Sequence, residues 1–298
     1  MSQPTNSDTP QGLVYAITAY VLWGFLPLYM KGVAHVPSVE IVAHRVIWSV
    51  PVAGALLIAL GRTRDLREAL QSPRMLAMAC LTAALVSMNW AIYVWAIASG
   101  HAIDAALGYY INPLFSILLG AVLLGERPSR AQIVAIALAA LGVIVLIVEA
   151  GEVPIVALGL MLTWGFYALF KKSLPIGPNQ GFLLEVLILT PVALAYLGWL
   201  GATGQSAFGG TTYDTLMLMG AGIVTAVPLL FYANGAKQVR LSTIGILQYI
   251  APTMIFLTAV FVFGEEIDQG RAMAFPLIWA ALVIYSWSML RQMRRSRL

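Results

Sequence analysis

Three ionisable side chains interrupt long apolar stretches of the sequence: His44, Arg45 and Glu185. Ionisable groups in such surroundings commonly pair with one another or bind ions and charged solutes, and histidine changes its charge near neutral pH. One interpretation is that one of the three binds a proton or the charged end of a solute. The other, which the sequence favours, is that Arg45 reaches outward to pair with Glu40 and that Glu185 reaches water on the cytoplasmic side.

Amide and aromatic side chains at helical spacing form a second group of candidates. Asn89 and Tyr93 lie four residues apart, on one face of a helix, with Trp90 beside them. Amides and hydroxyls bind polar groups, and indole rings hold an aromatic ring or an ammonium with about 0.5–2 kcal/mol. The alternatives are helix packing and interhelical hydrogen bonds. The candidates for a solute pathway are Trp23, Asn89, Trp90, Tyr93, Asn112, Trp164, Tyr232, Asn234, Gln248 and Tyr249.

Catalytic and metal-binding patterns are missing from the sequence. It has no Asp-rich diphosphate motif, no His/Glu zinc spacing, no serine with a His/Asp set and no Walker loop. Cys80 is the single cysteine, and His35, His44 and His101 lie far apart. A net charge of +4 without a long run of like charge does not indicate a nucleic-acid surface. We therefore expect no enzyme activity, cofactor, metal or nucleic-acid partner.

The composition places these side chains in a lipid bilayer. Of the 298 residues, 60% are hydrophobic and only 10% are charged, and the mean hydropathy is +0.85, whereas soluble domains carry about 25% charged residues. A membrane-spanning helix needs about 20 apolar residues. Stretches of this kind predict an all-α integral membrane protein with ten transmembrane helices, at residues 12–30, 39–60, 75–98, 105–124, 131–148, 154–170, 181–200, 215–236, 243–263 and 272–290.

Basic residues fix the expected orientation of these helices. When alternate connectors are assigned to alternate sides, 14 of the 17 Lys and Arg residues lie on one side, Lys31 and Arg271 lie on the other, and Arg45 lies within a span. Cytoplasmic connectors carry the excess of basic residues. We therefore expect a multi-pass protein of the bacterial inner membrane, with a cytoplasmic N-terminal tail (1–11) and a basic cytoplasmic C-terminal tail (291–298).

The two halves of the chain repeat one another. Residues 110–113 (Tyr-Ile-Asn-Pro) match residues 249–252 (Tyr-Ile-Ala-Pro) at an offset of 139, and a Gly-Glu pair follows each motif at the same distance. Trp-Gly-Phe at 23–25 recurs at 164–166. The repeats span 12–149 and 154–290, with five helices each, and an odd number of helices inverts the second repeat relative to the first. Inverted repeats are typical of secondary transporters.

Two paired prolines and one stripe of small residues bear on motion and assembly. Pro113 and Pro252 occupy corresponding places within spans, where they act either as hinges or as static kinks. Ala131, Ala135 and Ala139 form a stripe that permits close helix packing. Intramolecular packing is the commoner use of such a stripe, so the oligomeric state stays open and a monomer is favoured.

The repeated Tyr-Ile-x-Pro with its Gly-Glu pair resembles the EamA repeat of the drug/metabolite transporter (DMT) superfamily. Residues 44–49, 108–113 and 241–245 are similar to those of the RarD branch. The resemblance covers essentially the whole chain and implies two inverted five-helix EamA repeats that work by alternating access. A related branch, the YddG-type exporters, moves aromatic and other amino acids out of bacteria. The resemblance thus implies an exporter of amino acids, with the lipid bilayer and a small-molecule substrate as partners.

The main alternative is an exporter of multiple drugs or cationic compounds from the same superfamily. Such a protein is expected to hold a carboxylate within its cavity, and Glu185 is the one candidate, which the sequence places near the cytoplasmic end. A mostly uncharged set of polar residues suits a zwitterionic amino acid better. A channel or a lipid-translocating protein stays open as a further alternative.

Overall fold

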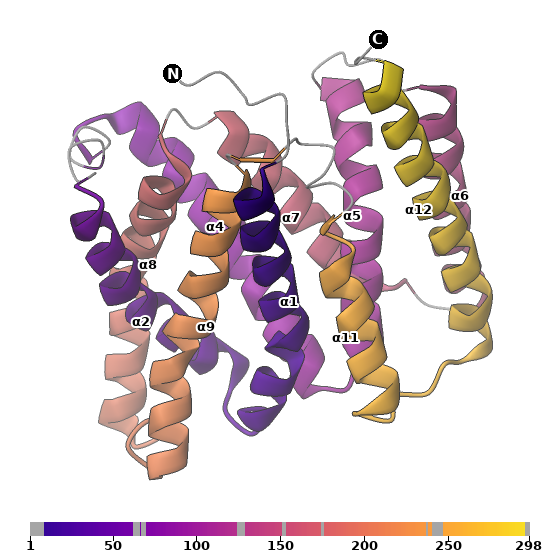
Figure 1. Ribbon diagram of the computed structural model, residues 1–298. Helices are drawn as coiled ribbons and strands as arrows, with labels where there is room; N and C mark the ends of the chain where they lie inside the picture. The colour runs from indigo at the N-terminus through magenta and orange to yellow at the C-terminus, as the bar shows by residue number, and fades with distance from the viewer. Residues whose placement is uncertain are drawn as a thin grey trace.

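The computed structural model describes residues 9–61, 66, 70–123, 129–150, 153–173, 176–236, 238, 239 and 247–295. The turn at Gly125 and Glu126 and the motif at 241–245 lie outside these residues. Among the described residues the chain forms ten helices (Figure 1), each of which overlaps one predicted stretch: α1 (Pro10–Gly32), α2 (Ser38–Ala59), α4 (Pro73–Ala98), α5 (Ala102–Leu123), α6 (Arg130–Ala150), α7 (Ile155–Ser173), α8 (Pro178–Thr203), α9 (Thr212–Ala236), α11 (Ile250–Phe261) and α12 (Gln269–Arg295).

Seven of these helices are long and apolar enough to cross a membrane, by length and composition. The apolar stretches Ile155–Phe170 and Ile250–Phe261 are shorter. With a rise of about 1.5 Å per residue, the 12 residues of α11 cover about 18 Å, less than the hydrocarbon core. The prediction of ten helices is therefore confirmed, and among the described residues seven of them meet both the length and the hydropathy of a membrane span.

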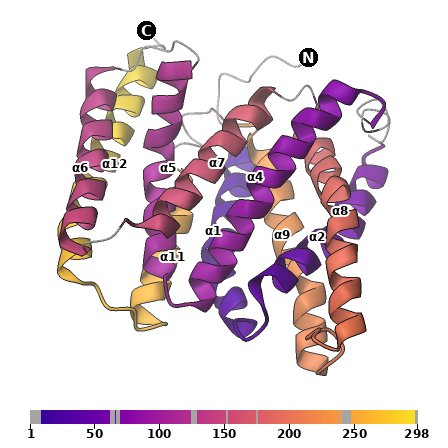
Figure 2. The same ribbon diagram turned by 180° about the vertical axis from the view of Figure 1, so that it is seen from behind.

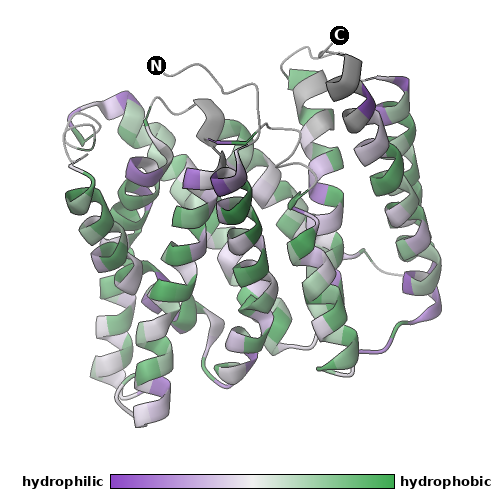
Figure 3. Ribbon diagram, in the orientation of Figure 1, coloured by the Kyte–Doolittle hydropathy of each residue, from purple (hydrophilic) through white to green (hydrophobic). Residues whose placement is uncertain are grey.

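The outward-facing side chains suit a lipid environment. Large apolar residues such as Ile58, Val148, Ile155, Val192 and Phe261 are at least 70% exposed. Figure 3 shows hydrophobic residues along the lengths of the helices and hydrophilic residues gathered toward their ends. Exposed apolar surface on this scale is unfavourable in water and favourable in a bilayer. The protein is therefore a multi-pass membrane protein.

The helices alternate in direction, so that the start of α1 and the end of α12 lie at the same end of the bundle (Figure 1). Helices α6 and α12 pack against one another at one edge, and α2, α8 and α9 lie at the other (Figure 2). Between them stand α1, α4, α5, α7 and α11. The central helix α1 packs on α9, α11 and α4, and the central helix α7 packs on α5 and α4.

The two Trp-Gly-Phe motifs serve close helix packing. A Cβ at Gly24 would lie 2.5 Å from the sulfur of Met254 on α11, and one at Gly165 would lie 2.4 Å from the Phe115 ring on α5. Phe115 and Met254 are themselves 139 residues apart, so the same contact occurs in both halves. Because each glycine lets its helix approach, the preceding tryptophan is carried into the centre of the bundle.

Candidate functional site: a central cavity

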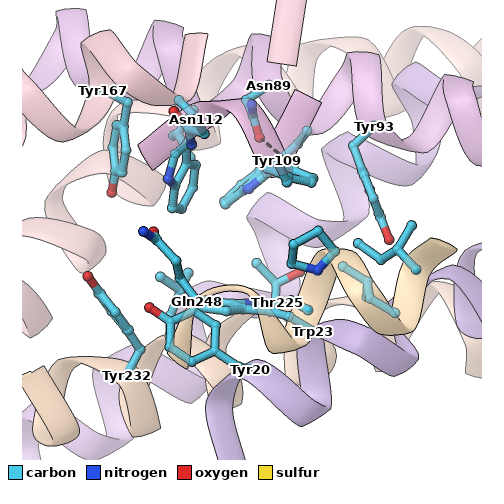
Figure 4. A pocket seen from close by; sticks show the side chains of 18 of the residues that line it. Tyr20, Trp23, Asn89, Tyr93, Tyr109, Asn112, Tyr167, Thr225, Tyr232 and Gln248 are labelled. Atoms are coloured by element: carbon cyan, nitrogen blue, oxygen red, sulfur yellow. Dashed lines mark hydrogen bonds between the residues drawn. The ribbon is translucent and has the colours of Figure 1, made fainter. Parts of the chain in front are cut away.

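A cavity of about 130 Å³ lies where seven helices meet. By the same measure a single water needs about 10–15 Å³, so the space suits a small molecule. Figure 4 shows side chains reaching into it from opposing walls, with Tyr167 and Tyr232 at one end and Tyr93 at the other. The residues that line it are Tyr20, Trp23, Leu26, Arg45, Val86, Asn89, Trp90, Tyr93, Tyr109, Asn112, Trp164, Tyr167, Thr225, Leu229, Tyr232, Gln248, Ala251, Pro252 and Ile255.

Eight of the ten pathway candidates from the sequence lie in this wall. The exceptions are Asn234, whose amide donates a hydrogen bond to the Leu230 carbonyl in its own helix at 2.8 Å, and Tyr249. Tyr249 lines a second, more open hollow with Thr253 and Trp279. Pro252 lies in the cavity wall, but Pro113 does not. The structure thus gathers most of the predicted residues and separates the two prolines.

Arg45 lies within the cavity and does not pair with Glu40. Its side chain is buried, Nε donates a hydrogen bond to Thr225 Oγ1 at 2.9 Å, and the guanidinium lies 4.7 Å from the centre of the Trp90 ring. Glu40 Oε1 instead accepts hydrogen bonds from Ser206 Oγ and the N–H groups of residues 207 and 208. The outward-pairing interpretation is therefore wrong, because Glu40 already caps this loop.

Glu185 does not reach water either. It is fully buried, and its Oε2 accepts a hydrogen bond from the Tyr167 hydroxyl at 3.2 Å. Tyr167 lines the cavity and Glu185 does not, so the carboxylate lies one residue behind the wall. His44 is also buried outside the cavity, where Nδ1 accepts a hydrogen bond from Trp48 and the ring stacks on Phe208.

Asn89 orients the wall through a complete set of hydrogen bonds. Its amide nitrogen donates to the Leu160 carbonyl at 3.2 Å and to Thr163 Oγ1 at 3.0 Å, and its oxygen accepts from the Tyr109 hydroxyl at 3.1 Å. These bonds join α4 to α7 and α5. Asn89 therefore holds Tyr109 in place, as the interhelical alternative for this residue anticipated.

Sequence reasoning missed several residues of the wall, although the repeat carried a signal for them. Thr225, Tyr109 and Tyr167 were not among the candidates. Each is separated by the repeat offset from another lining residue. The cavity contains seven such pairs, which are 86 with 225, 90 with 229, 93 with 232, 109 with 248 and 112 with 251 at an offset of 139, and 23 with 164 and 26 with 167 at 141.

Three buried polar atoms in this wall have no hydrogen-bond partner: Arg45 Nη1, the Tyr93 hydroxyl and Asn112 Oδ1. Leaving such a group unpaired costs about 1–3 kcal/mol, and more when it is charged. Arg45 is also the one formally charged residue among those described as lining the cavity. The wall thus offers two free donors and one free acceptor to a bound molecule.

The chain is related to membrane transporters over nearly its whole length. It is 44% identical to an uncharacterized transporter of Vibrio cholerae, over 95% of this chain and 94% of the relative. It is 39% identical to Protein RarD of Escherichia coli, over 97% and 98% respectively. The EamA-like transporter family model matches residues 10–148. This chain belongs to the EamA family.

A solved structure supports the same architecture. A crystal structure of a protein aligns with this EamA chain at a TM-score of 0.63, covering 93% of this chain and 98% of the other. The identity is 20%, so this likeness shows the fold alone. The Vibrio cholerae relative is named as a transporter, and the matching family model is that of EamA-like transporters.

Polar bonds tie the EamA bundle together at the end opposite the termini. Both carboxylate oxygens of Glu265 accept from the backbone N–H groups of Ala102 and Ile103, at 2.8 and 2.9 Å, and so cap α5. Arg271 pairs with Asp104 nearby. Glu265, from the second Gly-Glu pair, thus caps a helix from the other half of the chain.

Proposed function

We propose that this EamA protein is a secondary transporter that exports amino acids, aromatic and other neutral ones in particular, or related small metabolites. The observation that carries the proposal is a buried central cavity lined by aromatic and polar residues from both halves of the chain. Its aromatic walls suit a ring or an aliphatic chain, and its hydroxyl, amide and guanidinium groups suit the polar end of an amino acid. No step of the transport cycle calls for a cofactor or a metal.

Alternating access is supported by the way the helices pack. The two proposed repeats, 12–149 and 154–290, pair α1 with α7, α2 with α8, α4 with α9, α5 with α11 and α6 with α12. If the two repeats are related by symmetry, every helix contact has a counterpart between the paired helices. The contact between α1 and α9 corresponds to the contact between α7 and α4. The contact between α5 and α7 corresponds to the contact between α11 and α1. Both members of each pair of contacts occur, which agrees with a two-fold axis in the membrane plane.

The orientation follows from the positive-inside rule. Arg74, Arg130 and Arg291 lie at the end of the bundle that carries the termini, and Lys31 and Arg271 lie at the other. We place the tails 1–11 and 291–298 in the cytoplasm. The Glu265 cap and the Arg271–Asp104 pair then close the outer side of the cavity.

Counterflow in proteoliposomes tests the proposal. We expect saturable uptake of labelled phenylalanine or another neutral amino acid into vesicles preloaded with the same compound. Linear flux without exchange would overturn the carrier mechanism and indicate a channel. Transport of quaternary ammonium compounds without amino acids would favour the multidrug alternative.

Matched tryptophan variants connect the flux to the cavity. Trp164→Ala removes a ring from the wall, whereas Trp199→Ala removes one that is 54% exposed on α8. We expect the first substitution to reduce counterflow by up to about thirtyfold, in line with stacking energies of up to about 2 kcal/mol. The second is expected to leave counterflow within about twofold.

A further inference from the structure

We propose that Arg45 and Tyr93 form a carboxylate subsite, which makes an anionic group a requirement for binding in the cavity. This inference deepens the proposed function, because it names the part of the substrate that is recognised and the class of compound that is excluded. It predicts that amino acids and aryl carboxylates bind and that cationic amines of the same shape do not.

The first reason is that the charge of Arg45 has no counterion. Among the described residues, no carboxylate lies within ion-pair distance of its guanidinium, and no acidic residue lines the cavity. The side chain is only 3% exposed. A buried charge is costly unless it is paired. A bound carboxylate would supply the missing partner through charge-assisted hydrogen bonds.

The second reason is that the guanidinium is held in one orientation while part of it stays free. The bond from Nε to Thr225 and the contact with the Trp90 ring fix the plane of the group, and Nη1 has no partner. Tyr93 lines the same cavity, and its buried hydroxyl also has no partner. A carboxylate has two oxygens, and the wall offers two free donors of the kind that carboxylates accept from.

The third reason is that the fold does not need an arginine at this place. The positions in the second half that correspond to Arg45 at the two repeat offsets are Leu184 and Val186, and both are fully buried. An apolar residue therefore satisfies the packing of the equivalent helix. Most other lining residues form pairs related by a repeat offset, whereas the positive charge of Arg45 occurs on one side only. A role in binding accounts for that charge.

The groups that face Arg45 from the neighbouring helices are neutral. Trp90 contacts Arg45 from α4 and Thr225 from α9. The titratable groups near it are the tyrosines Tyr29 on α1, Tyr93 on α4 and Tyr109 on α5. Glu185 lies on α8, behind Tyr167. Figure 4 shows Tyr167 and Tyr93 at opposite ends of the cavity, so the carboxylate of Glu185 lies behind the end away from Tyr93.

Binding by the detergent-solubilised full-length protein tests this subsite without requiring transport. Three probes share one ring and differ in their charges: L-phenylalanine, 3-phenylpropanoate, which lacks the ammonium, and L-phenylalaninamide, which lacks the carboxylate. Binding is followed by thermal stabilisation across a concentration series. We expect the two carboxylates to bind at least tenfold more tightly than the amide, because hydrogen bonds to charged groups change affinity by about ten- to a hundredfold.

Variants then assign the preference to Arg45. In Arg45→Gln we expect the preference for 3-phenylpropanoate over the amide to fall at least tenfold, and in Arg45→Lys we expect it to persist. Arg74→Gln removes an equal charge from the exposed first turn of α4, away from the cavity, and is the matched control, with the preference unchanged. If Arg45→Gln does not fold, Tyr93→Phe replaces it and is expected to weaken carboxylate binding alone.

The outcomes separate this inference from the proposed function. An unchanged preference in Arg45→Gln, or a wild-type protein that binds the amide as tightly as the acids, overturns the subsite. Wild-type binding of the carboxylates without any counterflow overturns the carrier mechanism and supports the subsite. Failure of all three probes to bind the wild-type protein overturns the subsite for aryl carboxylates.

Discussion

The packing of α9 on α2 gives a sharp prediction, because one glycine sets the distance between Arg45 and its partner. A Cβ at Gly222 would lie 2.2 Å from the backbone carbon of Trp48 and 2.4 Å from its Cβ. Backbone atoms cannot rotate away, so α9 would have to move. Gly222 precedes Thr225 by three residues and Trp48 follows Arg45 by three, so the same movement stretches the 2.9 Å bond from Arg45 to Thr225.

Gly222→Ala is therefore expected to lower both stability and binding. Overpacking in a well-packed interior costs about 1–3 kcal/mol, against a gain of up to about 1 kcal/mol for Gly→Ala in a helix. The control is Gly54→Ala on α2, where a Cβ would have no neighbour within 4 Å. With only the propensity gain, Gly54→Ala is expected to be neutral or stabilising.

Thermal unfolding in one detergent compares the two glycine variants directly. About 1 kcal/mol corresponds to about 2–4 °C in domains of 150–250 residues, so we expect Gly222→Ala to melt several degrees below Gly54→Ala. The variant at Gly222 should also bind 3-phenylpropanoate more weakly. A Gly222→Ala protein as stable as Gly54→Ala, with unchanged binding, would refute the close approach of α2 and α9.

Three further predictions concern Glu265, Glu185 and Asn89. Glu265→Gln weakens a charge-assisted helix cap worth about 0.5–2 kcal/mol. We therefore expect faster labelling of a cysteine placed at the outer end of the cavity. Unchanged labelling would exclude a role of Glu265 in closing the cavity. Glu185→Gln keeps an oxygen that can accept the hydrogen bond from Tyr167, so we expect counterflow to persist, with His44→Ala as the comparison, and a loss of counterflow in Glu185→Gln alone would assign the carboxylate a part in coupling. Asn89→Leu leaves the Tyr109 hydroxyl without its acceptor. We therefore expect urea unfolding to show a loss of about 1–3 kcal/mol in the free energy of unfolding. A loss below about 0.5 kcal/mol, the usual range for surface substitutions, would contradict this role of Asn89.

Much of this architecture is visible in the sequence, because a bilayer imposes a simple pattern. Apolar stretches locate the helices. The repeat offset relates many of the residues that share the cavity, including Tyr109, which was overlooked, to Gln248, which was not. The direction in which Arg45 points is not visible in the same way. It depends on Glu40 being occupied by the loop at residues 206–208 and on Gly222 letting α9 come close, and both are contacts between distant parts of the chain.

The unequal packing of corresponding helix pairs bears on the transport cycle. Helices α2 and α9 pack more extensively than α8 and α4, which the proposed symmetry makes their counterparts. Gly222 corresponds to Ala83 at the repeat offset of 139, so α4 carries at this place the Cβ that α9 lacks. If the halves exchange conformations during transport, α2 and α9 adopt the looser packing and the bond from Arg45 to Thr225 is lost. The carboxylate subsite is then formed in one state and loosened in the other, which provides a physical means of releasing the substrate.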